Sequence, residues 1–83
     1  MTSTPTVQTG ANVRAEMARK GISQATLGAA VSISQPGLSK RLRGATPFDI
    51  NEIVRISIFL DVPLDQLLSG LGDVDATKNP VAS

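Results

Sequence analysis

Two short apolar patterns stand so close together in this sequence that the helices they predict must meet at a sharp corner. They occupy residues 24–31 and 34–43, with two residues between them. Each contains two apolar residues four positions apart, which places both side chains on one helix face. These are Leu27 with Val31, and Leu38 with Leu42. A serine stands at or just before the start of each segment and can cap its first turn.

Three further helices are predicted around this pair. Helical apolar spacing between start and stop residues marks segments 5–20, 50–60 and 63–68. The first can begin at Thr4, as a cap before a proline, or later, near Thr9. Asp49 with Glu52 has the spacing of a capping box. We therefore expect an all-α protein with five helices.

The length of 83 residues predicts one compact domain with a thin core. We expect this domain to span residues 7–71, after a flexible N-terminal segment of residues 1–6. Residues 72–83 are polar, contain Pro80 and lack an apolar period, which is typical of a disordered tail.

The chain contains neither cysteine nor histidine, and this excludes several kinds of chemistry. Without cysteine there can be no disulfide, no cysteine metal site and no thiolate nucleophile. Without histidine the usual proton shuttle near neutral pH is missing. We therefore expect no enzyme, no metal, no cofactor and no small-molecule ligand. No stretch reaches the roughly 18 apolar residues of a membrane span, and no secretion signal is recognisable. A cytoplasmic protein without membrane contact is expected.

Charge is divided unevenly along the chain. From Arg14 to Arg43 there are six cations and one acid, Glu16, whereas residues 44–83 contain six acids and two cations. A basic half that faces a polyanion, with an acidic half turned away, would suit phosphate binding. A solvated surface of mixed charge is the alternative, and charge alone does not separate the two.

The second helix of the corner has an outward face suited to a DNA groove. With Leu38 and Leu42 turned inward, the opposite face of residues 34–43 contains short polar, amide and cationic groups. They are Pro36, Ser39, Lys40 and Arg43, with Gln35 at the edge. Two short helices joined by a tight turn form a helix-turn-helix, in which the second is the recognition helix.

Three motifs resemble a known family: GISQATLG at residues 21–28, ISQPGLSKRLRG at 33–44 and LDVPLDQLL at 60–68. Residues 13–68, about two thirds of the chain, resemble the Cro and lambda-repressor family of phage and bacterial regulators. The resemblance implies a lambda-repressor-like five-helix domain that binds double-stranded operator DNA, usually as a homodimer on a palindrome. It favours a Cro-like phage repressor, in the cytoplasm of a bacterial host, that occludes a promoter. An antitoxin or anti-repressor that acts through a protein partner is the alternative.

By position, the resemblance assigns DNA contacts to both helices of the corner. Gln24 lies near a phosphate, and base readout falls to Gln35, Pro36, Gly37, Ser39 and Lys40. Further phosphate contacts are expected at Ser34, Arg41, Arg43 and Arg14. Ser34 has a competing role, because a hydroxyl that caps a helix is not free for a phosphate.

The sequence departs from the family pattern within the corner. Ser32 stands where the family usually has glycine, and Arg41 where it usually has an apolar residue, with Leu42 one place later. The orientation of the recognition helix is therefore open by one position. Pro36 and Gly37 replace residues that often hydrogen-bond bases, so direct readout is expected to use fewer groups.

The predicted helix 50–60 has more apolar residues than one inward face needs. We expect an inward stripe of Ile50, Ile53, Ile56, Ser57 and Leu60. Val54, Ile58 and Phe59 lie outside it. Either the last helix or the tail covers these three, or they form a two-fold dimer interface. Such an interface would set two recognition helices about 34 Å apart, one turn of DNA.

Overall fold

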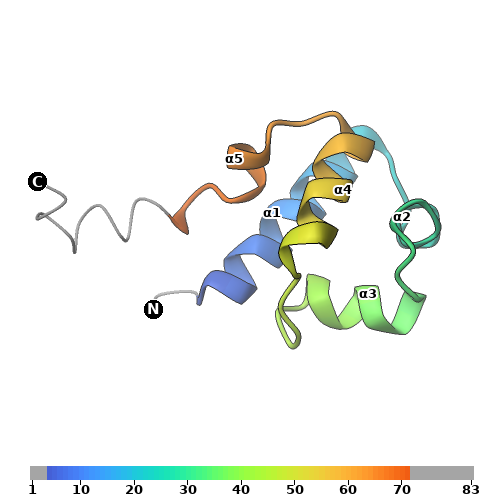
Figure 1. Ribbon diagram of the computed structural model, residues 1–83, viewed down its shortest axis with the longest axis horizontal. Coiled ribbons are helices and arrows are strands. Elements are labelled where there is room, and N and C mark those ends of the chain that lie inside the picture. The colour runs from blue at the N-terminus through green and yellow to red at the C-terminus, as the bar shows by residue number, and fades with distance from the viewer. Residues whose placement is uncertain (1–3, 72–83) are drawn as a thin grey trace, which may run out of the picture.

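Five helices make up the part of the protein that the computed structural model describes, residues 4–71. They are α1 (Pro5–Lys20), α2 (Gln24–Val31), α3 (Gln35–Leu42), α4 (Ile50–Leu60) and α5 (Leu64–Leu67) (Figure 1). There is no strand in the described range, and the all-α, five-helix prediction is confirmed. No helix within it is long and apolar enough to cross a membrane.

Helix α1 begins at the earlier of its two predicted starts. The Thr4 hydroxyl accepts a hydrogen bond from the Val7 N–H at 3.2 Å. Pro5 fits the first turn because backbone amides there have no helical acceptor. Pro5 and Thr6 are therefore helical, although the sequence-based division placed them in a flexible segment. The predicted tail, residues 72–83, lies outside the described residues.

Side-chain caps set the starts of the next three helices, as the sequence predicts. The hydroxyls of Ser23 and Ser34 each accept a hydrogen bond from the amide three residues later, at 3.1 and 3.2 Å. Asp49 and Glu52 form a reciprocal capping box, with N–H to carboxylate distances of 2.8 and 3.0 Å. These caps satisfy amide groups that the first turn of a helix leaves without a backbone partner.

All five helices contribute to one apolar core. Its buried residues are Val13, Met17, Leu27, Val31, Leu38, Leu42, Ile53, Ile56, Leu60, Val62 and Leu67. Burial of both Leu38 and Leu42 resolves the orientation of α3 that the sequence left open. Ile50 was predicted to face inward, and this is wrong: it is 65% exposed. The reason is that an open groove, rather than packed core, lies beside the first turn of α4.

Two glycines let backbone segments approach more closely than a larger residue would allow. A Cβ atom at Gly28 would lie 2.7 Å from the Ile33 carbonyl oxygen, so glycine permits the close contact between α2 and the turn that follows it. Gly10 lies inside α1, one residue after the later helix start that the sequence allows near Thr9. A Cβ atom there would lie 2.6 Å from the Leu42 carbonyl oxygen. Helix α1 thus supports the last turn of α3 by direct backbone contact.

Candidate nucleic-acid interface

Helices α2 and α3 form the predicted corner, with α2 seen nearly end-on beside α3 in Figure 1. The chain turns at Ser32, whose backbone is left-handed, with φ 60° and ψ 42°. The Ile33 N–H donates to the Gly28 carbonyl oxygen at 2.9 Å and closes the turn. Glycine adopts this conformation without steric cost, which explains why a glycine suits the turn position that Ser32 occupies.

The predicted contact residues at the helix starts and on the outer side of α3 are exposed. They are Gln24, Gln35, Pro36, Lys40 and Arg43. Figure 1 shows α3 along the lower edge of the molecule, with one side turned away from the other helices. Gln24 opens α2, and Gln35 with Pro36 opens α3. Free amides and the positive end of the helix dipole favour an anion at such positions.

Three other predicted contact residues have packing or capping roles in this corner. The Ser34 hydroxyl accepts a hydrogen bond from the Gly37 N–H at 3.2 Å, so it is the helix cap. Gly37 has a packing role, because a Cβ atom there would lie 3.0 Å from the Ser34 Oγ and would crowd the cap. Ser39 is half-buried. Gly37 and Ser39 are therefore less accessible than the exposed contact residues, and Ser34 is exposed but its hydroxyl is already engaged in the cap.

Arg41 is set apart from the exposed cations of the corner. Its side chain is half-buried and pairs with Glu52 at the start of α4, Nε to Oε1, at 3.0 Å. Its Nη1 also donates to the Gly37 carbonyl oxygen at 2.9 Å. This placement differs from the phosphate-contacting position that the sequence predicted for Arg41.

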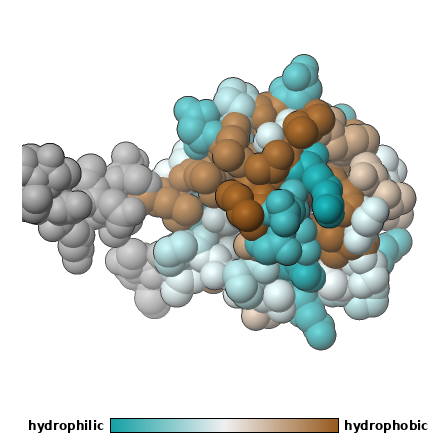
Figure 2. All heavy atoms as spheres, viewed as in Figure 1, coloured by the Kyte–Doolittle hydropathy of each residue, from teal (hydrophilic) through white to brown (hydrophobic). Residues whose placement is uncertain are grey.

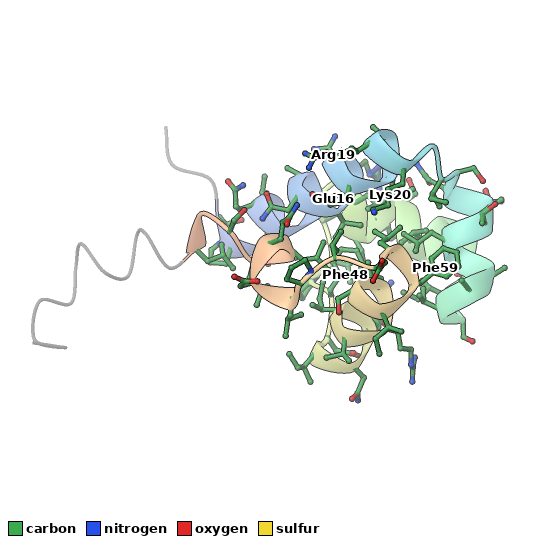
Figure 3. All side chains as sticks on the ribbon, turned by 90° about the horizontal axis from the view of Figure 1, so that it is seen from above. Glu16, Arg19, Lys20, Phe48 and Phe59 are labelled. Atoms are coloured by element: carbon green, nitrogen blue, oxygen red, sulfur yellow. The ribbon has the colours of Figure 1, made fainter. Side chains whose placement is uncertain are left out.

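Among the other cations of the described residues, one on α1 is neutralised by an ion pair. Arg19 pairs with Glu16, with 3.2 Å between Nη1 and Oε2, and Figure 3 shows both residues with Lys20 along α1. The other cations in residues 4–71 form no ion pair there: Arg14, Lys20, Lys40, Arg43 and Arg55. Two of them, Lys40 and Arg43, lie at α3 and keep the recognition helix positive.

Glu16 has a structural role that the sequence analysis missed. Its carboxylate is buried, and Gln66 Nε2 donates to its Oε2 at 2.6 Å, joining α1 to the end of α5. A signal was present, because Glu16 lies three residues after Val13 and next to Met17, on the apolar face of α1. A buried carboxylate needs such hydrogen-bond partners.

Helix α4 presents an exposed apolar stripe. Ile50, Val54 and Ile58 recur every four residues and are all exposed, Ile58 to 73%. Phe59 is also exposed and projects from α4 toward the side of the molecule formed by α2 (Figure 3). Figure 2 shows apolar side chains gathered over α4 and α5, next to a hydrophilic strip that runs down the same face. Within the described residues, α5 does not cover the three residues assigned to a dimer interface.

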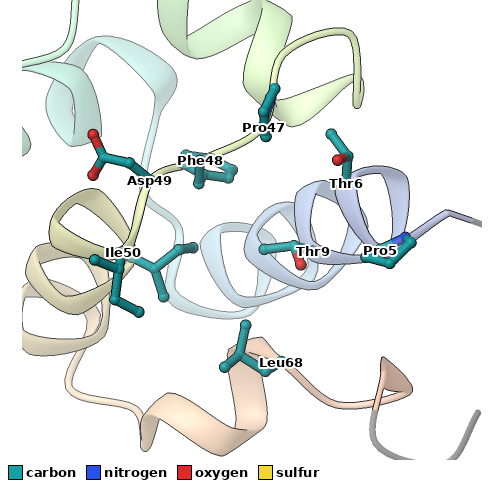
Figure 4. A pocket seen from close by; sticks show the side chains of 9 residues that line it. Pro5, Thr6, Thr9, Pro47, Phe48, Asp49, Ile50 and Leu68 are labelled. Carbon is teal, nitrogen blue, oxygen red and sulfur yellow. The ribbon is translucent and has the colours of Figure 1, made fainter. Parts of the chain in front are cut away.

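A shallow groove of about 350 Å³ lies between α1, the loop before α4, and α5 (Figure 4). Its lining is mainly apolar and consists of Pro5, Thr6, Thr9, Pro47, Phe48, Asp49, Ile50, Ile53 and Leu68. The one charged member, Asp49, is engaged as the cap of α4. None of the predicted DNA-contact residues lines this groove.

Comparison with known proteins agrees with this geometry. A helix-turn-helix family model matches residues 13–67, which include the whole corner and the core. No curated protein sequence gives a significant match. The chain is similar in structure to the restriction-modification controller protein C.AhdI from Aeromonas hydrophila, with a TM-score of 0.69 and 24% identity over 74% of this chain and 92% of that chain. The chain belongs to the Cro and lambda-repressor-like helix-turn-helix family of DNA-binding transcriptional regulators.

Proposed function

We propose that this chain is a sequence-specific repressor that inserts α3 into the major groove of an operator and thereby covers a promoter. The exposed corner is the observation that supports this proposal most directly. The starts of α2 and α3 present amide and polar groups, and Lys40 with Arg43 adds unpaired positive charge. The major groove admits one α-helix, and phosphates flank it on both sides.

Each exposed residue has a distinct role in this proposal. Gln35 reads a base, since a side-chain amide can pair with N6 and N7 of adenine. Pro36 lies beside it, is exposed, and contributes an apolar contact at the base edges. Gln24 binds a phosphate from the start of α2 and fixes the register without reading sequence.

Three cations supply the electrostatic part of the binding. Arg43 binds a phosphate beside the groove, and exposed Arg14 extends the positive surface onto α1. Lys40, which the family resemblance assigns to base readout, lies in the last turn of α3 next to Arg43, and we propose that it also binds a phosphate. Each phosphate contact contributes about 0.9 to the magnitude of the slope of log K against log salt. Removal of a cation that makes one such contact therefore reduces the magnitude of the slope by about 0.9. This slope counts phosphate contacts even before the operator sequence is known.

The experiment that tests the proposal is selection of bound duplexes from a random DNA library, followed by salt titration on the selected site. We expect one enriched palindromic sequence. On a palindrome bound by two chains each substitution removes two phosphate contacts, so Lys40→Gln and Arg43→Gln should each reduce the slope by about 1.8, which is about 0.9 per chain. Lys20→Gln, which removes an exposed cation from the last turn of α1, should leave the slope unchanged. No enrichment and no salt-dependent binding would contradict the proposal and favour an interaction module. Transcription from a promoter that overlaps the selected site then distinguishes repression from activation.

We also infer that the repressor acts as a homodimer through the exposed face of α4. Val54, Ile58 and Phe59, the residues assigned to an interface, lie on this face, and Ile50 extends the stripe by one turn. A helix whose solvent-exposed side is apolar is typical of a partner-binding surface. A two-fold axis at α4 would place two copies of α3 on one face of the DNA, one helical turn apart.

Sedimentation of the protein at high micromolar concentration tests this interface. We expect the wild type to dimerise and Ile58→Asp to be monomeric with its helical signal retained, because Ile58 is mostly exposed in the single chain. Ala15→Asp adds the same charge to an exposed position of α1, away from this face of α4, and should remain dimeric. A monomeric wild type would locate dimerisation elsewhere or restrict it to DNA.

A further inference from the structure

The side chain of Arg41 makes one hydrogen bond within α3, the recognition helix, and one to α4, the helix that follows it. Its Nε donates to Glu52 Oε1 at 3.0 Å, and its Nη1 donates to the Gly37 carbonyl oxygen at 2.9 Å. Only 22% of the Arg41 side chain and 13% of the Glu52 side chain are exposed. Ionic strength therefore screens this pair less than it screens the exposed cations around it.

The carboxylate of Glu52 is shared between this ion pair and the first turn of α4. The same Oε1 atom that accepts from Arg41 also accepts from the Asp49 N–H at 3.0 Å, as half of the capping box. Helix α3 packs mainly on α1 and α2. Within residues 4–71, the bond from Arg41 to Glu52 is the side-chain hydrogen bond that connects α3 directly to α4.

Gly37 makes room for this arrangement. A Cβ atom at position 37 would lie 3.1 Å from Arg41 Nη1 and 3.0 Å from the Ser34 Oγ. With glycine there, the guanidinium folds back along α3 and reaches the Gly37 carbonyl one turn earlier. A phosphate contact would require Arg41 to leave Glu52, and the largely buried carboxylate would then lose its cationic partner, at considerable cost.

We propose, on the basis of the proposed DNA-binding function, that Arg41 is a positioning residue that sets the orientation of α3 through Glu52 and binds no phosphate. The exposed cations beside it supply affinity, and the Arg41–Glu52 pair keeps the reading face of α3 aligned with the groove. Loss of the pair loosens that alignment. Discrimination between DNA sequences then falls, while the number of phosphates neutralised stays the same.

Two variants distinguish positioning from phosphate binding, measured on the duplex selected by the wild type and on a scrambled duplex of equal length. Arg41→Gln is expected to leave the salt slope unchanged while the ratio of the two affinities falls by about fivefold or more, the lower end of what one bidentate base contact supplies. Lys40→Gln is the matched control, because it removes a neighbouring exposed cation and should reduce the slope by about 0.9 per bound chain, or about 1.8 for two chains on a palindrome.

The direction in which a second substitution changes DNA binding separates positioning from phosphate binding further. Glu52→Ala removes a negative charge, so electrostatics alone predicts tighter binding to DNA, and more so if the released Arg41 could bind a phosphate. Positioning predicts a lower affinity ratio instead. Asp61→Asn removes an exposed acid at the other end of α4 and should leave the ratio unchanged. The double variant Arg41→Leu with Glu52→Leu replaces the ion pair by an apolar contact and should recover discrimination that Glu52→Ala loses.

A slope reduced in Arg41→Gln by about 0.9 per bound chain, with wild-type binding intact, would overturn the positioning role and leave the proposed function standing. Tighter binding by Glu52→Ala with an undiminished affinity ratio would do the same. If the wild type enriches no duplex from the random library, the proposed function fails, and the positioning role fails with it. If the double variant does not fold, the salt slope of Arg41→Gln still decides the question.

Discussion

Replacing Ser32 by glycine should stabilise the protein, because this turn residue has a left-handed backbone with φ 60° and ψ 42°. For a residue with a Cβ atom this conformation costs about 1–2 kcal/mol, since Cβ approaches the following carbonyl oxygen. Glycine avoids that cost but loses about 0.5–1 kcal/mol more conformational entropy when the chain folds. The difference favours Ser32→Gly by about 0.5–1 kcal/mol.

Thermal unfolding followed by circular dichroism measures this effect. For a domain of this size, 1 kcal/mol corresponds to about 4–8 °C in Tm, so the Ser32→Gly variant should unfold roughly 2–8 °C higher than the wild type. Urea unfolding should show a higher midpoint with an unchanged m-value, because the surface exposed on unfolding stays the same.

Ser32→Ala is the control that isolates the backbone. Alanine lacks the hydroxyl but keeps Cβ, so it should unfold no higher than the wild type. The reasoning would be refuted if Ser32→Gly unfolded at or below the wild-type temperature. An equal gain in Ser32→Ala would attribute the effect to the hydroxyl instead of to φ.

Two further substitutions test the corner and its reading face. Gly28→Ala should destabilise by about 1–3 kcal/mol, because its Cβ would lie 2.7 Å from the Ile33 backbone oxygen, which cannot move without opening the turn. Urea unfolding measures this loss, and an unchanged stability would show that α2 and the turn can separate freely. Gln35→Ala should relax the preference at one base pair per half-site, by about 1–3 kcal/mol, while Gln24→Ala weakens binding to all sequences alike. Repeated site selection checks this difference, which an unaltered preference in Gln35→Ala would contradict.

The helices themselves follow from the sequence because caps and apolar spacing are local. Ser34 bonds an amide three residues away, and Leu38 with Leu42 faces the same side of any helix that contains both. The starts of α2 and α4 could be placed for the same reason, and so could the exposed ends that include Gln24 and Gln35. The helix-turn-helix corner was therefore predictable from neighbours along the chain.

The partners of charged and apolar side chains depended instead on how the helices cross. Arg41 reads as one more cation of a basic segment until α4 brings Glu52, eleven residues later, against it. From the sequence alone, Gly10 is only a residue that weakens a helix, whereas in the structure the backbone of α3 packs against it. Ile50 has the spacing of a core residue, but in the structure an open groove lies beside it. Helical periodicity specifies which face a residue occupies, but the element that meets that face is set by packing over the whole domain.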